Sequence, residues 1–424
     1  MSAAPETPVV PAKRLSALAP FEVKSFRFQW PADLATSWAI EMENIILAWY
    51  ILVETQSVVM LTLFGSLTYL GTMFAPVLGV TGQRVGNKTT YCAVRLGLVL
   101  SSAVTMTLAV TGTLQPIHVF FIGAAMSVLR PADMVLRYAM LGETMPASGI
   151  IGATSISRTT QDSARVVGAL TGAALAATLG LAQTYIVVAT LYCSSLLLSL
   201  KVTNKPVTQA ARDARPASAF GDLRDGLVYV WRTPHLQAAM AIAFLVNVSA
   251  FPLTNSLLPV VAKDVYHTDQ RGLSYLAASF AFGALMGSII LSRIGYRLPP
   301  ARTMLIFCGI WYSMTLIFAQ MPGFTAGIPM IMLAGCAQSM SMVPLSAMLL
   351  RTTREGFRGH VMGTRTLMIY GVPVGLLIAG PLIAHLGYRV TATLYCVSGL
   401  MCAAWIGWYW RDYIWRADAP ANKR

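Results

Sequence analysis

The stretch that decides the fold is residues 37–54, SWAIEMENIILAWYILVE, an apolar run that reads as a membrane-spanning helix. Two carboxylates, Glu41 and Glu43, lie near its middle. A charged group at membrane depth costs roughly 2.5–3.5 kcal/mol on insertion scales, so it needs a water-filled cavity or a partner. At about 100° per residue the two acids point roughly 200° apart. We therefore expect one acid to face a central pathway and the other a neighbouring helix; the alternative is that both are structural and paired with arginines.

The composition places the whole chain in a membrane. Of its 424 residues 56% are hydrophobic and only 11% are charged, whereas a soluble domain carries about 25% charged residues. The length allows about twelve spans of ~20 residues. The net charge of +14 does not indicate nucleic-acid binding, because Lys and Arg collect in the loops that face the cytoplasm.

No pattern predicts an enzyme, a cofactor or a metal site. The six cysteines fall in apolar runs without a C-x-x-C pair, which indicates reduced packing residues. The five histidines lack metal-ligand spacing. The stretch GQRVGNKT differs from a phosphate-binding loop in its spacing.

Apolar blocks predict an all-α membrane protein of twelve helices in two six-helix repeats. The predicted spans are 34–53, 58–80, 91–110, 117–140, 150–179, 184–200, 236–261, 273–294, 304–320, 328–350, 361–386 and 392–410. They divide the chain into a disordered tail (1–20), a first bundle (21–202), a polar linker (203–232), a second bundle (233–411) and a tail (412–424). Basic turns follow spans two and eight, GQRVGNKTT and SRIGYRLPPART, and such internal repeats are typical of transporters.

The loops also predict orientation. Lys and Arg gather at the amino terminus, after spans two, six, eight and ten, and in the tail after the last span. Cytoplasmic loops carry this excess, so we expect both termini in the cytoplasm.

Charged residues recur inside the fourth and fifth predicted spans. They are Arg130, Asp133 and Arg137 in the fourth and Arg158, Asp162 and Arg165 in the fifth. Spacings of three, four and seven residues place each set on one helix face. On the fifth span that face continues to Gly168 and Gly172, a small-residue packing stripe. We favour a structural ion-pair network for Arg137 and Arg158, and leave structure and function open for Arg130, Asp162 and Arg165.

The seventh predicted span carries Asn247, Pro252, Asn255 and Pro259. The prolines break the helix and free backbone carbonyls. The two asparagines lie on nearly one face, where they would hydrogen-bond either a ligand or a neighbouring helix.

Several stretches resemble the major facilitator superfamily, and in particular a bacterial subgroup typified by the enterobactin exporter. They are RPADMVLRYAMLGETMP, SISRTTQDSARVVGALTG, FGDLRDGLVYVWRTPHLQ, LLPVVAKDVYHTD and FRGHVMGTRTLMIYGVPVGLLIAGPLIAHLGYR. The resemblance covers residues 21–410 and implies two bundles that alternate access to one site. In the turn after span two, Gly79, Arg84, Gly86 and Lys88 fit the family's gating pattern, while Gly82 stands where relatives have Asp. In span five, Gly168 and Ala169 stand where antiporters have Gly-Pro.

Together these observations predict a transporter of the bacterial inner membrane that exports a small amphiphilic compound, a siderophore or a drug, by proton antiport. The proton-coupling candidates are Glu41, Glu43 and Asp162, and the substrate-pathway candidates are Arg130, Asp133, Arg165, Asn247 and Asn255. We expect a monomer whose partners are the substrate, protons and lipid. The alternatives are a nutrient or ion uptake permease and, in another class, a membrane receptor or lipid-handling protein.

Overall fold

The computed structural model describes residues 19–74, 81–82, 85–146, 149–203, 219–295, 298–354 and 357–414, and these residues contain helices but no strand. We call residues 19–203 the first half and 219–414 the second half. The first half contains α1 (Lys24–Thr55), α2 (Val58–Leu70), α4 (Asn87–Val110), α5 (Pro116–Thr144), α6 (Ile150–Leu179) and α7 (Leu181–Leu200), with single turns η1 (Ala19–Glu22) and η2 (Gly71–Phe74). Residues 1–18 of the predicted tail and residues 204–218 of the predicted linker lie outside the described residues.

The second half begins with α9 (Ala219–Trp231), which lies in the part of the chain predicted as a polar linker. Its other helices are α10 (Pro234–Phe251), α11 (Leu258–Val260), α12 (Gln270–Ile294), α13 (Pro300–Gln320), α14 (Phe324–Thr352), α15 (Arg358–Leu367), α16 (Gly371–Leu386), α17 (Tyr388–Tyr409) and α18 (Arg411–Ile414). Wider π-helical turns, η3 (Pro252–Ser256) and η4 (Val261–Val265), follow Phe251 and α11, and a 3₁₀ turn, η7 (Met368–Tyr370), separates α15 from α16. The helix break predicted at Pro252 therefore coincides with a π-helical turn, whereas Pro259 lies in the short α11 between the two π-helical turns.

Nine described helical segments are long and apolar enough to cross a membrane, which makes this a multi-pass membrane protein. They are α4, α5, α7, residues 234–256, α12, α13, α14, residues 360–386 and α17. The long helices α1 and α6 fall outside this set because charged residues interrupt them. Helix α2 has 13 described residues, and the end of its predicted span, 75–80, lies outside the described residues. The count of twelve therefore stays a prediction.

The start of the first long helix differs from the sequence expectation. The sequence predicts an amphipathic lead-in at 21–29, with Trp30 and Pro31 at the membrane interface before the first span at 34–53. Instead α1 begins at Lys24 and continues through Pro31 to Thr55. Proline lacks the backbone N–H, so it removes one helical hydrogen bond, yet tertiary packing holds the helix on both sides of it.

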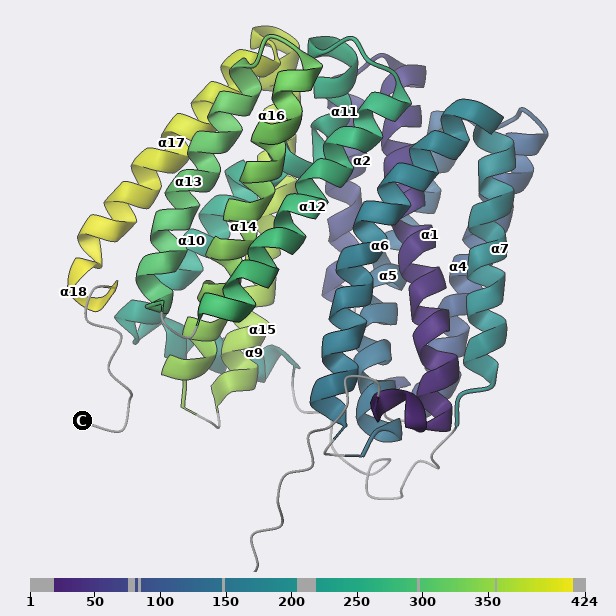
Figure 1. Cartoon of the computed structure of the whole chain (residues 1–424), viewed down its shortest axis with the longest axis horizontal. Helices are drawn as coiled ribbons and strands as arrows, with labels where there is room; N and C mark the ends of the chain where they lie inside the picture. Colours follow the sequence, from purple (N-terminus) through teal and green to yellow (C-terminus); the bar gives the residue numbers. More distant parts are fainter. Residues whose placement is uncertain are drawn as a thin grey trace, which may run out of the picture.

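The helices form two groups that lie side by side (Figure 1). In the first group α1 packs against α6 and α7, and α4 against α5 and α7. In the second, α14 packs against α12 and α13, and α10 against α16 and α17. Between the groups the main contacts are α6 with α12 and α2 with α16. The second membrane helix of each half thus meets the fifth of the other half.

The α2–α16 contact depends on the absence of a side chain. A Cβ atom added at Gly380 would lie 2.2 Å from Oγ1 of Thr62, well inside van der Waals contact. The Ser66 hydroxyl donates to the Pro373 carbonyl across the same interface at 3.3 Å. Glycine therefore allows the two halves to approach closely at α2 and α16.

The halves are also joined where α1 ends, which we call the far end; the end where α1 begins is the terminal end. Nζ of Lys263 donates to Oε1 of Gln56 at 2.5 Å and to the Leu52 carbonyl at 3.4 Å. A cation is favourable at this place because the last carbonyls of a helix carry partial negative charge. Lys263 therefore links the second half to the carboxyl end of α1.

Candidate functional site

Charged side chains in the interior of the first half form three groups, and the deepest is a closed network of Asp33, Arg95, Asp133 and Arg137. Arg95 contacts Asp33 at 2.5 Å and Asp133 at 3.0 Å. Arg137 contacts Asp133 at 2.8 Å and Asp33 at 3.4 Å. All four side chains are at most 4% exposed. Two acids and two arginines cancel in charge, so burial leaves no net charge in the interior.

Neutral side chains complete this network. The Tyr91 hydroxyl donates to Asp33 at 2.5 Å. Arg95 donates to the hydroxyls of Ser195 and Ser199 at 2.8 and 2.7 Å. Buried polar networks of this kind fix helices relative to one another, although Oδ2 of Asp33 and Nε of Arg137 have no hydrogen-bond partner among the described residues. The position of Asp133, which the sequence offered as a pathway candidate, favours a structural role, because both of its oxygens are bound inside the helix bundle.

The second group surrounds Glu43, whose side chain is 0% exposed. Its Oε2 accepts from Arg130 at 2.9 Å and from the Tyr192 hydroxyl at 3.0 Å, and its Oε1 from the Tyr185 hydroxyl at 3.5 Å. Arg130 also donates to Oδ1 of Asn44. One carboxylate is thus held by α5 and α7 together, in a site closed to solvent.

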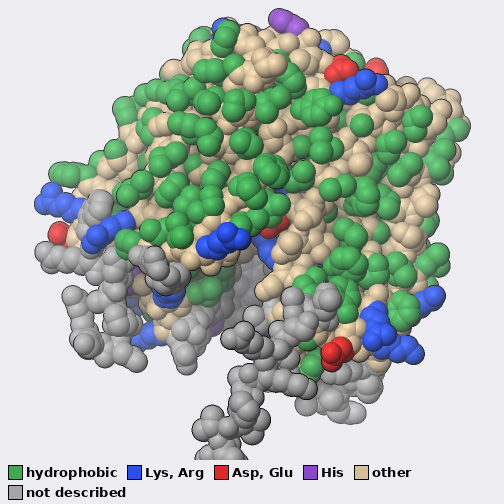
Figure 2. Space-filling view, viewed as in Figure 1, with side chains coloured by type: hydrophobic (Ala, Val, Ile, Leu, Met, Phe, Trp, Pro, Cys, Tyr) green, Lys and Arg blue, Asp and Glu red, His purple; other side chains and the backbone are tan. Residues whose placement is uncertain are grey.

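The third group is more open, and we call it the α6 charge row: Arg158, Asp162 and Arg165 of α6 with Glu41 of α1. Arg158 contacts Asp162 at 3.3 Å, and Arg165 contacts Asp162 at 4.0 Å and Glu41 at 3.5 Å. The arginines are 59% and 56% exposed, and the acids 21% and 28%. Figure 2 shows the surface hollowed between the two halves towards the terminal end, with acidic and basic side chains at the edge of the hollow.

Close packing of α1 on α6 sets the position of Glu41. A Cβ atom added at Gly168 would lie 2.7 Å from Cβ of Glu41, and one at Gly172 would lie 2.8 Å from Cα of Met42. The predicted small-residue stripe therefore lies directly against α1. This approach places Glu41 within reach of Arg165, one helical turn before Gly168 on the same face.

Glu41 and Glu43 thus have different surroundings. Glu41 is partly exposed and bound to one arginine on α6. Glu43 is fully buried and bound to one arginine and two tyrosines on α5 and α7. The difference follows from their offset on the helix, because two residues apart they point to separate neighbours.

The asparagines of the seventh predicted span lie apart from these charges. Nδ2 of Asn247 donates to the Ala243 carbonyl of its own helix at 2.7 Å. Asn255 is exposed, and its Nδ2 lies 3.4 Å from Oγ1 of Thr254. The structure therefore does not join either side chain to the charge groups of the first half.

Of the predicted gating turn, Gly79 and Arg84 lie outside the described residues. Gly86 has a φ of 118°, a backbone conformation that favours glycine. Nζ of Lys88 donates to the Leu200 carbonyl at the end of α7, at 2.9 Å. Lys88 therefore binds a helix carboxyl end of its own half.

Sequence reasoning missed four residues of these groups: Asp33, Arg95, Tyr185 and Tyr192. The first two carry a signal, since each is a charge next to or inside an apolar run. The tyrosines carry none, because aromatic residues are common in spans and their partner is set by helix packing. Within the described residues, no three His, Cys, Asp or Glu side chains are grouped so as to hold a metal.

Comparison with known proteins places this arrangement in a family. A profile of the Major Facilitator Superfamily matches residues 34–370 and 240–424. The multidrug efflux pump Tap of Mycolicibacterium fortuitum is 25% identical over 268 residues, which are 62% of this chain and 64% of the pump. The match thus spans less than two thirds of the pump's length.

Solved structures share the fold at low identity. A bacterial homologue of the lysosomal transporter Spinster, inward-facing and unoccupied, gives a TM-score of 0.72 at 13% identity and covers 95% of this chain and 99% of its own. The nucleoside transporter NupG gives 0.68 at 13% identity and covers 92% and 99%. A D-xylose-proton symporter gives 0.68 at 13% identity and covers 95% and 98%. With the family profile covering most of its length, the chain belongs to the Major Facilitator Superfamily and is a transporter, not an enzyme.

Proposed function

We propose that this transporter exports a small amphiphilic compound by proton antiport and alternating access, with Glu41 as the proton-coupling residue. The observation that carries the proposal is the exposure of Glu41. It is a carboxylate in the middle of a long buried helix, 28% exposed and 3.5 Å from the guanidinium of Arg165. A carboxylate that meets water can exchange protons with it directly, and intramembrane acids that face a water-filled cavity mark proton pathways.

The chemistry follows from the pair. A proton on Glu41 removes the negative charge that holds Arg165, and so weakens the contact between α1 and α6. Arg165 then has Asp162 at 4.0 Å as its other acid, and an anionic group of the substrate competes for the same guanidinium. The proton and the substrate thereby act on the same arginine at different steps of the transport cycle, without contacting each other.

In this proposal Glu43 is structural. Three donors hold it in a closed site, and protonation there would leave Arg130, only 16% exposed, without its acid. Such a buried cation is costly. Asp162 is the second coupling candidate, because it is partly exposed and lies between two arginines.

The proposal also covers the membrane topology, the direction of transport and the class of substrate. Nine apolar spans with α1, α2 and α6 make twelve, in two six-helix repeats with cytoplasmic termini in a bacterial inner membrane. Similarity to a multidrug efflux pump supports export of a drug-like compound, and resemblance to the enterobactin-exporter subgroup supports a siderophore. We expect a monomer. Uptake is the second candidate, since solved relatives in fold include a proton symporter of D-xylose.

The test is drug-stimulated proton release from everted vesicles, screened over catecholates and lipophilic cations. Glu41→Gln should reduce proton-driven transport at least about tenfold, while substrate binding and downhill exchange persist. The matched control is Glu54→Gln, an exposed acid at the end of the same helix, which should transport at the wild-type rate. Full transport against a gradient by Glu41→Gln would remove Glu41 and promote Asp162.

A further inference from the structure

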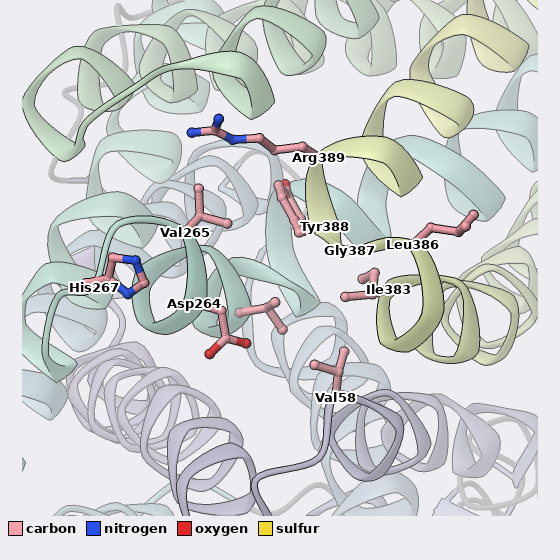
Figure 3. A pocket seen from close by; sticks show the side chains of 10 residues that line it. Val58, Asp264, Val265, His267, Ile383, Leu386, Gly387, Tyr388 and Arg389 are labelled. Atoms are coloured by element: carbon pink, nitrogen blue, oxygen red, sulfur yellow. The ribbon is translucent and has the colours of Figure 1, made fainter.

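A cavity of about 510 Å³ lies at the far end, away from the three charge groups (Figure 3). Its volume is within the ~300–1,000 Å³ range of small-molecule sites. The cavity is lined by Val58, Val260, Asp264, Val265, His267, Ile383, Leu386, Gly387, Tyr388 and Arg389. Val58 begins α2 in the first half, and the other lining residues belong to the second half. The cavity therefore forms where the two halves meet.

Two opposite charges lie on a wall that is largely aliphatic. Asp264 comes from the π-helical turn η4, and Arg389 from the first turn of α17. Both are exposed, and neither has an ion-pair partner in the part of the chain that the structure describes. Figure 3 shows Arg389 at one edge of the cavity and Asp264 nearer to Val58. They line one cavity without neutralising each other.

Further polar groups at the site are also open to a ligand. Nη2 of Arg389 contacts the Met321 carbonyl at 3.4 Å, which is long for a hydrogen bond and leaves its other donors available. Tyr388 also lines the cavity, but its hydroxyl is buried and is not accessible to a ligand in this structure. His267, held at a φ of 50°, adds an exposed imidazole to the lining.

We propose that this cavity binds a small amphiphilic zwitterion, with its ammonium beside Asp264, its anionic group beside Arg389 and its apolar body against the aliphatic wall. Charge-assisted hydrogen bonds at both ends select a molecule that carries both charges. Because Val58 comes from the other half, a bound ligand bridges the halves. It therefore stabilises the arrangement with the far end closed, since a ligand favours the state it binds more tightly. This proposal does not depend on the direction of transport or on the coupling ion.

Three compounds with one apolar body test the proposal: 8-aminooctanoic acid, octylamine and octanoic acid. We would titrate each into the purified full-length protein by calorimetry. The zwitterion should bind at least about tenfold more tightly than either singly charged compound. It should also raise the thermal unfolding temperature, because it binds the folded, closed form. Equal weak binding of all three would indicate apolar partitioning only and would overturn the proposal.

Two neutralising substitutions test which residue binds which charge of the ligand. Asp264→Asn should weaken octylamine and the zwitterion about tenfold and leave octanoic acid unchanged. Arg389→Gln should do the reverse, weakening octanoic acid and the zwitterion. Val58→Phe, which fills the cavity from the other half, should weaken all three, and Glu54→Gln, outside the lining, should change none. If neither neutralising substitution alters the order of the three compounds' affinities, the cavity is not a zwitterion-binding site.

Discussion

The two halves use different means to hold helices of similar arrangement. Every ion pair among the described residues joins side chains of the first half, from Asp33 to Arg165. The interior of the second half is aromatic and sulfur-containing, with Trp311, Tyr312 and Cys308 all 0% exposed. Its buried polar contacts are neutral, such as the 2.6 Å hydrogen bond between Ser249 and Tyr312.

The packing of the first half's interior therefore depends on charge, whereas the packing of the second half's described interior does not. Adding or removing a proton in the first half changes an ion pair, whereas the described interior of the second half offers no such pair. Apolar packing also tolerates small sliding better than ion pairs, which require fixed geometry. The comparison therefore predicts that neutralising a charge in the first half destabilises the protein more, the more deeply that charge is buried. In the second half, neutralising a charge should act through contacts at its edges.

The largest effect is expected at Arg95, the centre of the closed network. Arg95→Met removes the partner of both Asp33 and Asp133, and leaves buried carboxylates that Arg137 alone cannot neutralise. Breaking a buried pair in this way costs about 3–5 kcal/mol. We expect little folded protein in the membrane fraction and a strongly lowered unfolding temperature.

Arg271→Met is the matched control, because Arg271 is an exposed arginine at the start of α12 in the second half. It should leave expression and the unfolding temperature unchanged. If Arg95→Met unfolds at the wild-type temperature, the network does not stabilise the first half, and the contrast between the halves loses its energetic basis.

An intermediate effect is expected at Glu43. Glu43→Gln keeps the shape and one acceptor for Tyr192 or Arg130, but removes the charge that neutralises Arg130. Hydrogen bonds to charged groups contribute about 1.5–3 kcal/mol, so thermal unfolding should shift clearly downward. Glu41→Gln, at a half-open pair, should leave unfolding nearly unchanged. A larger shift for Glu41→Gln than for Glu43→Gln would reverse the assignment of roles.

Glu41 and Glu43 also show which features of the structure can be predicted from the sequence. Helical periodicity predicted that Glu41 and Glu43 point in different directions, one to a central pathway and one to a neighbouring helix, and it placed Arg158, Asp162 and Arg165 on one face. It did not predict which acid is buried, because that depends on which helices pack on each face of α1: α5 and α7 enclose Glu43, whereas Glu41 beside α6 stays partly exposed. Apolar blocks predicted a multi-pass helical protein and located most helices.

The network around Arg95 shows what periodicity leaves out. Its four charges come from three helices, α1, α4 and α5, and a pattern along one helix carries no information on pairing between helices. The continuation of α1 through Pro31 was missed for a related reason, since tertiary packing overrides a local helix-breaking tendency.

The smallest effect concerns the edge of the second half, at Lys263. This residue donates to Gln56 and to the end of α1, and it is partly exposed. Lys263→Met keeps much of the side chain's apolar length but removes the charge. Exposed ionic contacts contribute about 0.2–1 kcal/mol, so folding should be unaffected while the balance between closed and open far ends shifts towards open.

The shift is measurable with a cysteine introduced at Thr62, a residue of the α2–α16 contact that is 1% exposed. The parental protein for this experiment has the exposed Cys193 and Cys402 replaced by serine. Lys263→Met should raise the labelling rate of that cysteine by a polar thiol reagent up to about fivefold, the factor that 1 kcal/mol gives. Lys263→Arg, which keeps the charge, should label at the parental rate. Equal labelling of the Met and Arg variants would show that Lys263 does not hold the far end closed, and that apolar contacts between α2 and α16 do so without it.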